Sequence, residues 1–150
     1  MATLTTSTRY LLPPGLQELH QETLEWESTL GLWKEELAFF TRLIPKYRNE
    51  LRTRTEIQEL NHVRFLLDYY YNELIPILEA RLATQKAQLR VLMEPGSVQD
   101  ESKCRNTHAS LAKQIHSCEQ EFASFRDELY TLMEKALSRT KFRKELLEAN

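Results

Sequence analysis

Apolar side chains recur every three or four positions along most of this chain, in three long stretches. The longest repeats without a break from Leu111 to Ala136, and the same spacing extends it from Cys104 to Leu146. A repeat of about 3.5 residues is typical of helices that bury one seam against a partner helix. No glycine or proline interrupts this stretch. We therefore expect a helix over about 98–148, whose periodic part alone is roughly 65 Å long.

The first stretch predicts a helix over about 16–44. Pro45 disfavours helical geometry at the residue before it, so the helix is expected to end at Ile44. Leu24, Phe39 and Leu43 widen its apolar stripe, which indicates contact with two neighbouring helices. The expected seam consists of Leu16, Leu19, Thr23, Trp26, Leu30, Trp33, Leu37, Phe40 and Ile44.

The second stretch predicts a helix over about 53–93, which begins at the capping box Thr53-x-x-Glu56. Pro76 cannot donate a backbone hydrogen bond and its ring clashes with the carbonyl of Asn72, so we expect a kink near Asn72 to Pro76. The expected seam consists of Ile57, Leu60, Val63, Leu67, Tyr71, Leu74, Leu78, Leu82, Gln85, Leu89 and Leu92.

Short connections join the three helices, because Pro95-Gly96-Ser97 forms the clearest turn and Ser97-x-x-Asp100 offers a second capping box. Helices joined by short connections pack as antiparallel neighbours. The predicted fold is all-α: an antiparallel three-helix bundle of long, coiled-coil-like helices in one domain, 16–150. Residues 1–15 are expected to form a flexible tail, rich in Thr and Ser.

Composition limits the classes of function. The net charge of -2 gives no overall attraction to nucleic acid or to an anionic membrane. No apolar run approaches the ~20 residues that span a bilayer, and the first residues are too weakly apolar for a signal peptide. The two cysteines lie on one predicted helix, about 21 Å apart, so they are expected to stay reduced, as in a cytoplasmic protein.

The lengths of the helices suggest self-association. The first helix is the shortest, so one end of the hairpin formed by the other two is expected to lack a cover. Large exposed apolar patches usually have a partner, and a second copy would complete a local four-helix arrangement. The alternative cover is the N-terminal segment with Tyr10, Leu11 and Leu12. The leucines expected in a homodimer are Leu82, Leu89, Leu92 and Leu111.

A metal site is the main chemical alternative. Glu59-x-x-His62 has the spacing of one half of a ferritin-like di-iron site, and His116-x-x-Glu119 has the reverse order on the third helix. Leu60 and Val63 are expected to face the core, which turns Glu59 and His62 sideways or outward. We therefore expect a solvated helix face and no cofactor, with a ferritin-like metal-binding bundle as the alternative.

Cys104 and His108 lie four residues apart on one helix face, but no further Cys or His lies nearby to complete a zinc or copper site. They are expected to be a buried thiol and a histidine at the edge of the core. No glycine-rich phosphate loop and no nucleophile elbow occurs in the chain. The sequence thus predicts a protein that is not an enzyme.

Basic residues gather where the first connection should meet the C-terminus. Helix C-termini favour cations, so this cluster has a purely structural explanation. It is also a candidate contact for an acidic protein, or for nucleic acid with a strong dependence on salt. The residues are Lys46, Arg48, Arg52, Arg54, Lys135, Arg139, Lys141, Arg143 and Lys144.

One set of residues in the predicted first helix consists of Leu19, His20, Leu24, Trp26, Trp33, Glu35, Glu36, Leu37, Phe39, Phe40, Arg42 and Leu43. In these residues the helix resembles uncharacterised small helical proteins of bacteria. The resemblance implies an all-helical cytoplasmic protein and transfers no activity. The sequence therefore predicts a non-enzymatic interaction or scaffold protein that self-associates or binds a protein partner.

Overall fold

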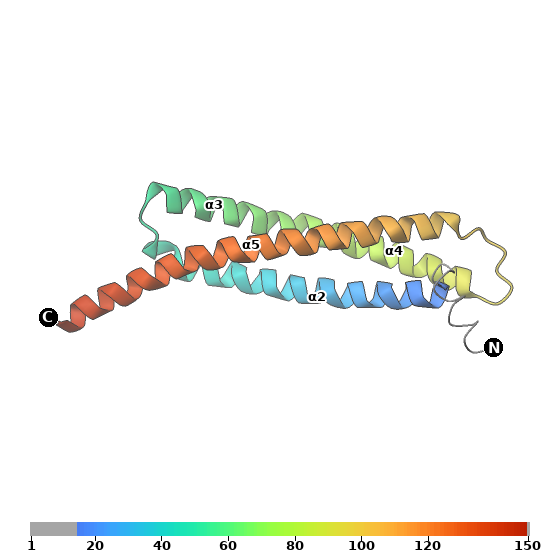
Figure 1. The fold of residues 1–150 in the computed structure, drawn as a ribbon, viewed down its shortest axis with the longest axis horizontal. Coiled ribbons are helices and arrows are strands. Elements are labelled where there is room, and N and C mark those ends of the chain that lie inside the picture. The colour runs from blue at the N-terminus through green and yellow to red at the C-terminus, as the bar shows by residue number, and fades with distance from the viewer. Residues whose placement is uncertain (1–14, 150) are drawn as a thin grey trace, which may run out of the picture.

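The protein is a bundle of three long antiparallel helices (Figure 1). The computed structural model describes residues 15–149, with only the backbone of Phe142, so the predicted tail lies almost entirely outside the described residues. The elements are α2 (Leu16–Tyr47), a 3-10 turn (Arg48–Glu50), α3 (Arg54–Tyr69), a π-helical turn (Tyr70–Leu74), α4 (Ile75–Met93) and α5 (Ser102–Ala149). Because α3, the π-helical turn and α4 form one continuous rod, the predicted all-α, three-helix architecture is confirmed.

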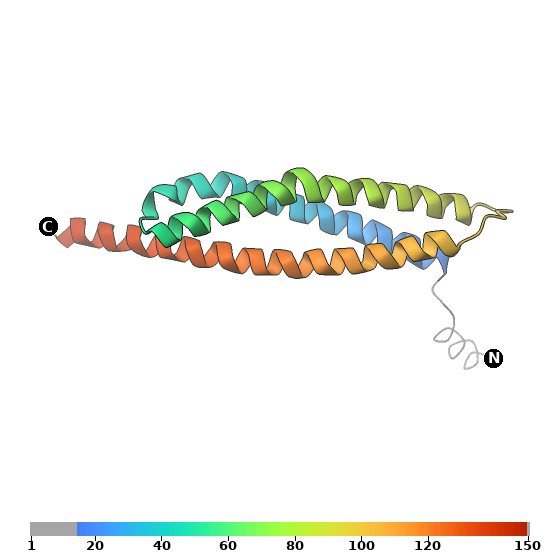
Figure 2. The ribbon, with the colours of Figure 1, turned by 90° about the horizontal axis from the view of Figure 1, so that it is seen from above.

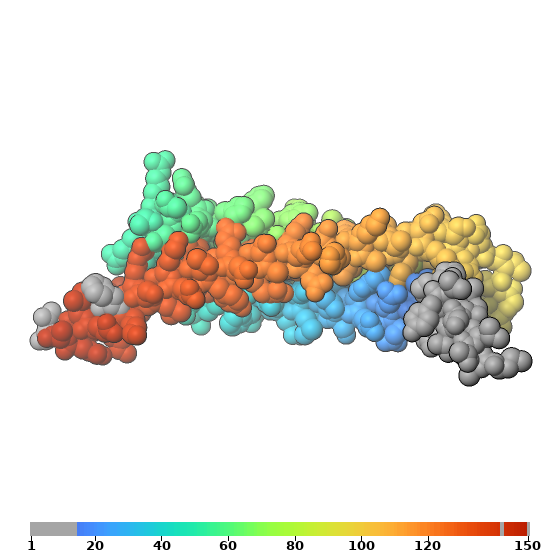
Figure 3. All heavy atoms as spheres, in the orientation of Figure 1, coloured from blue at the N-terminus to red at the C-terminus, as the bar shows by residue number. Residues whose placement is uncertain are grey.

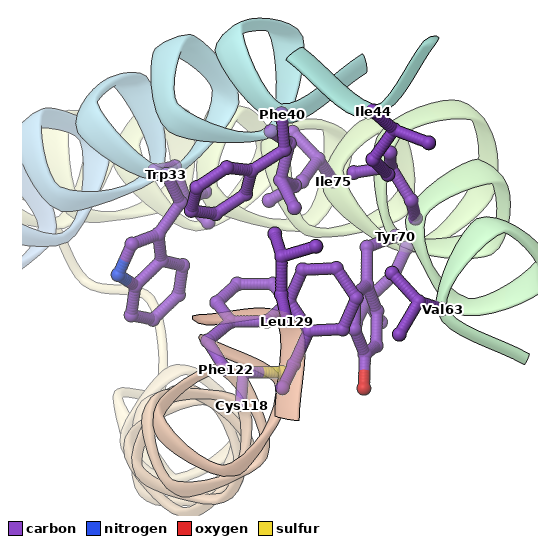
Figure 4. Close-up of a cluster of buried hydrophobic side chains, with 14 of the residues drawn as sticks. Trp33, Phe40, Ile44, Val63, Tyr70, Ile75, Cys118, Phe122 and Leu129 are labelled. Atoms are coloured by element: carbon purple, nitrogen blue, oxygen red, sulfur yellow. The ribbon is translucent and has the colours of Figure 1, made fainter. Parts of the chain in front are cut away.

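The predicted seams meet in one elongated core. Figure 4 shows side chains from all three rods converging on its aromatic centre. The ring of Phe122 lies 4.7 Å, between centroids, from both Trp33 and Tyr70, and meets both nearly edge-on. Aromatic pairs in this geometry are favourable beyond the area that they bury. The three rods are therefore held together by side chains at the positions that the spacing predicts, with two exceptions in the second rod.

The first exception follows from Pro76. The N–H of Ile75 donates to the carbonyl of Tyr70, five residues earlier, which is the hydrogen bond of a π-helical turn. This turn lies where the sequence predicts a kink, near Asn72 to Pro76. Tyr70, the first residue of this turn, lies in the core and Tyr71 is only half-buried, so the prediction of Tyr71 as the core tyrosine is wrong.

The second exception is Ile57, which is exposed although its spacing places it on the seam. Its neighbour Glu56 is buried instead, because Glu56 bonds Arg139 of α5 and accepts a hydrogen bond from the N–H of Arg52 at 3.1 Å. Thr53 caps α3 as predicted, since its hydroxyl accepts from the N–H of Glu56 at 3.1 Å. An ion pair at the start of α3 thus replaces the expected apolar contact.

Two predicted boundaries are also corrected. Helix α2 continues to Tyr47, three residues beyond Ile44, because the fixed φ of Pro45 is compatible with a helix and its missing N–H costs only one hydrogen bond near the end. Helix α5 begins at Ser102 rather than near 98. The carboxylate of Asp100 accepts from the N–H of Ser102 at 2.9 Å and from its hydroxyl at 2.6 Å, so Asp100 and not Ser97 marks the start.

The leucines expected to be left uncovered are buried within one chain. Helix α2 packs mainly against α4 along its length, so its N-terminal part covers the end that was expected to be two-stranded. Leu19 of α2 lies in a second apolar cluster with Leu89, Leu92 and Cys104. The self-association surface predicted from helix lengths is therefore wrong. Its residues, all in the core, are Leu82, Leu89, Leu92 and Leu111.

The C-terminal end of α5 projects beyond the rest of the bundle, as both ribbon views and the space-filling view show (Figures 1, 2 and 3). Leu146 and Leu147 on this end are exposed. On the face shown in Figure 3, α5 lies over the other rods through most of their length. The bundle is thus covered by α5 on that side.

Candidate functional site

A groove of about 940 Å³ lies between the C-terminal half of α2 and the rod formed by α3 and the π-helical turn. Figure 1 shows these two rods diverging towards the first connection. Ile44 and Leu67 contribute buried apolar atoms to the groove, and no residue of α5 lines it. Phe65 stands on its α3 side with 71% of its surface exposed. A large aromatic side chain in water beside an apolar groove is typical of a protein-binding surface.

Positive charge surrounds this groove. Arg42 and Arg48 come from α2 and the 3-10 turn, and Arg64 comes from α3. None of the three forms an ion pair with another of the residues 15–149. The one acid in the lining, Asp68, accepts a hydrogen bond from Asn72 at 2.6 Å. The groove therefore carries excess positive charge on a protein whose net charge is -2.

The predicted basic cluster does assemble at the end where the first connection meets α5, but two of its arginines are engaged. Arg139 bonds both carboxylate oxygens of Glu56, and Arg143 bonds Glu50 at 2.6 Å. The hydrogen bonds from Arg139 hold the pKa of Glu56 below its usual value. The exposed members of the cluster without an ion pair among the described residues are Lys46, Arg48, Arg52, Arg54, Lys141 and Lys144.

The four candidate metal ligands do not converge. Glu59 pairs with Lys135 at 3.5 Å, and His62 lies 3.9 Å from Glu128. His116 lies 3.2 Å from Gln120, on the same helix and about 18 Å before Glu128. Glu119 is exposed on α5 as well. Within residues 15–149 no three His, Cys, Asp or Glu side chains gather as a metal site would require.

Cys104 and His108 lie in a buried polar cluster. The side-chain amide nitrogen of Gln85 lies 3.0 Å from the carbonyl of Cys104 and 3.4 Å from Nδ1 of His108. The imidazole also stacks on Trp26, with 4.6 Å between centroids, and its Nε2 lies 3.7 Å from Glu22. Burial lowers the pKa of His108 and raises the pKa of the Cys104 thiol. Both groups are therefore stabilised in their neutral forms, as structural core residues are.

A second groove, of about 450 Å³, follows α2 and α4, but ion pairs lie along it. Lys34 pairs with Glu79 at 3.4 Å, and Lys86 pairs with Glu27 at 3.3 Å. All four side chains line the groove. Their charges are therefore already balanced across the two helices. This groove offers a partner little unpaired charge.

The sequence did not predict the groove between α2 and α3 or most of its contact residues. Arg48 was predicted as a contact for an anionic partner, but Phe65 and Arg64 were not singled out, and Arg42 was named only for the resemblance of the first helix. One signal was available. Phe65 is a large apolar residue that lies off the seam formed by Val63 and Leu67, and it follows an arginine directly.

Comparisons with protein-family models, with curated proteins and with solved structures find no significant match to this chain. The resemblance of the first helix to small bacterial helical proteins therefore stays a prediction. No helix among residues 15–149 combines the length and the apolar character needed to cross a bilayer. The structure of the chain and the surface described above are therefore the basis for proposing a function.

Proposed function

We propose that this protein is a non-enzymatic interaction protein that binds a helix of another protein in the groove between α2 and α3. The observation that carries the proposal is Phe65, a phenylalanine that is 71% exposed beside an apolar groove with no cover from α5. Exposed aromatic residues at the centre of a patch commonly supply much of the energy of a protein–protein contact. Self-association stays a prediction, but it requires a surface other than the four buried leucines.

The dimensions of the groove favour a helical ligand. Its lining spans residues 38–48 on one side and 61–72 on the other, which corresponds to roughly 15 Å, or about three helical turns. The two walls are antiparallel helices, so a further helix laid between them occupies the position of the fourth member of a bundle. Helices commonly bind such grooves through apolar residues at every third or fourth position.

Photo-crosslinking from position 65 tests the proposal. A photoreactive phenylalanine analogue in place of Phe65 is expected to crosslink a distinct partner protein in cells of the natural host. Leu32 is the matched control site, because it is 67% exposed on α2 and does not line the groove. A partner captured from position 65 and not from position 32 supports the proposal. Equal capture from both positions, or no capture from either, contradicts it.

A further inference from the structure

Among residues 15–149, a polar side-chain contact joins each pair of neighbouring helices from different rods, except one pair. Helices α2 and α4 are joined by the pair of Lys34 and Glu79, and α3 and α5 by the pair of Lys135 and Glu59. Between α4 and α5, Gln85 bonds the backbone of Cys104. Each of these seams therefore carries a polar contact from helix to helix.

The seam of α2 with α5 follows the same rule, because Arg126 bonds Glu36. The seam of α2 with α3 does not. Among residues 15–149 no ion pair or side-chain hydrogen bond joins α2 to α3. Arg42, Arg48 and Arg64 line this seam without an ion pair to a carboxylate. The one acid in the lining, Asp68, accepts a hydrogen bond from Asn72 of the same rod instead. The missing component of the seam is therefore negative charge.

The apolar part of the seam is incomplete in the same place. Ile44 and Leu67 are buried at the base of the groove, whereas Phe65 remains in water above it. A ligand that covers Phe65 has to be apolar on the face that it turns inwards. The same ligand passes between arginines, whose guanidinium groups bind carboxylates in a bidentate manner. A single helix with one apolar and one acidic face provides both.

We propose that the occupant of the groove is an acidic amphipathic helix of about three turns, carried by a separate protein. This inference rests on the proposed function and specifies its partner. The apolar stripe of the ligand covers Phe65, and its glutamates or aspartates pair with Arg42, Arg48 and Arg64. The ligand thereby closes the seam that lacks a polar contact between its helices among residues 15–149.

The charges disfavour a second copy of this chain as the occupant. A twofold axis through the groove would set the arginines of one copy against the same arginines of the other, because such an interface pairs identical surfaces. The projecting end of α5 is also unsuitable, because it carries no excess of negative charge: its lysines equal its glutamates in number, and its arginine, Arg143, is paired with Glu50. Residues 1–14 contain no acid at all and one arginine. A separate acidic partner is the occupant that the charges favour.

Three synthetic helical peptides of about twelve residues test the inference. They share one leucine and phenylalanine stripe, and they carry glutamate, glutamine or lysine at every polar position. Binding to the full chain is followed by fluorescence anisotropy. We expect the glutamate peptide to bind at least about tenfold more tightly than the glutamine peptide. Its affinity is expected to fall as the salt concentration rises. The lysine peptide is expected not to bind. Phe65→Ala is expected to lower the affinity for the glutamate peptide by about tenfold or more.

The controls separate this inference from the proposed function. Leu32→Ala is expected to leave binding unchanged, and Phe65→Ala should retain its helical circular dichroism because Phe65 is exposed. Arg42→Glu combined with Arg64→Glu should reverse the preference towards the lysine peptide. If all three peptides bind equally and the binding depends on Phe65, the inference that the partner is acidic is wrong, and the proposed function still holds. Binding of none overturns the inference, as does a fall in the protein's own solution mass on Phe65→Ala, which would indicate a second copy.

Discussion

Replacing Phe40 by alanine is expected to lower the free energy of unfolding by about 3–5 kcal/mol. The Phe40 side chain is 0% exposed, and its ring lies 6.1 Å from that of Phe125 and 5.8 Å from that of Tyr130, between centroids. Truncation removes these contacts and leaves a cavity that close-packed helices cannot collapse around. Urea denaturation followed by circular dichroism measures the change.

The adjacent phenylalanine provides the matched control. Phe39 is 49% exposed on the same helix, so Phe39→Ala is expected to cost about 1 kcal/mol or less. The two variants remove the same atoms from neighbouring positions, and their difference reports which face of α2 is buried. Equal losses for both would contradict the orientation of α2 in the bundle.

Leu82→Ala is expected to cost about 2–5 kcal/mol, and the loss should not depend on protein concentration. Leu82 is fully buried between rods of a single chain, although the helix lengths predicted it at an interface between two copies. If a second copy covered Leu82, the midpoint of unfolding would rise with protein concentration, because association stabilises by mass action. Ile77→Ala is the control, since Ile77 is 52% exposed on the same α4 helix.

The regular spacing of apolar residues was sufficient to predict the three rods, and the short connections predicted their antiparallel order. Leu30, Leu67 and Phe125 are all buried, as a repeat of about 3.5 residues requires. Periodicity failed where the backbone departs from α-helical geometry. Tyr70, the first residue of the π-helical turn at Tyr70–Leu74, lies in the core in place of Tyr71. Both tyrosines follow Leu67 at a helical spacing, so spacing alone did not decide between them.

The prediction of an uncovered end failed for a different reason. Helix length was counted up to Pro45, but α2 runs to Tyr47 and packs along α4 rather than near the first connection only. The position of a short helix along a longer pair is set by tertiary packing, which a single sequence does not specify. The opening between α2 and α3 arises from the same packing, so the spacing did not predict the groove, although it places Phe65 off the seam of its helix.

The sequence could not show which charged residues form ion pairs between helices. The basic cluster was expected from the topology, and Arg139 and Arg143 do lie beside the first connection. Glu56, however, was expected only as a capping residue, and its ion pair with Arg139 depends on a contact between positions 83 apart in sequence. Such pairs decide which charges remain available to a partner. For that reason Arg42 and Arg64 are recognised as available charges only in the three-dimensional structure.

The central claim is that the groove between α2 and α3 is open to solvent at Phe65. Phe65→Cys tests it by the rate at which thiols react with a water-soluble disulfide reagent. The native thiols of Cys104 and Cys118 are buried, and burial raises the pKa of both, so they should react slowly. We predict one rapidly reacting thiol, at position 65, which the glutamate peptide protects. A variant in which all three thiols react slowly without peptide would contradict the open groove.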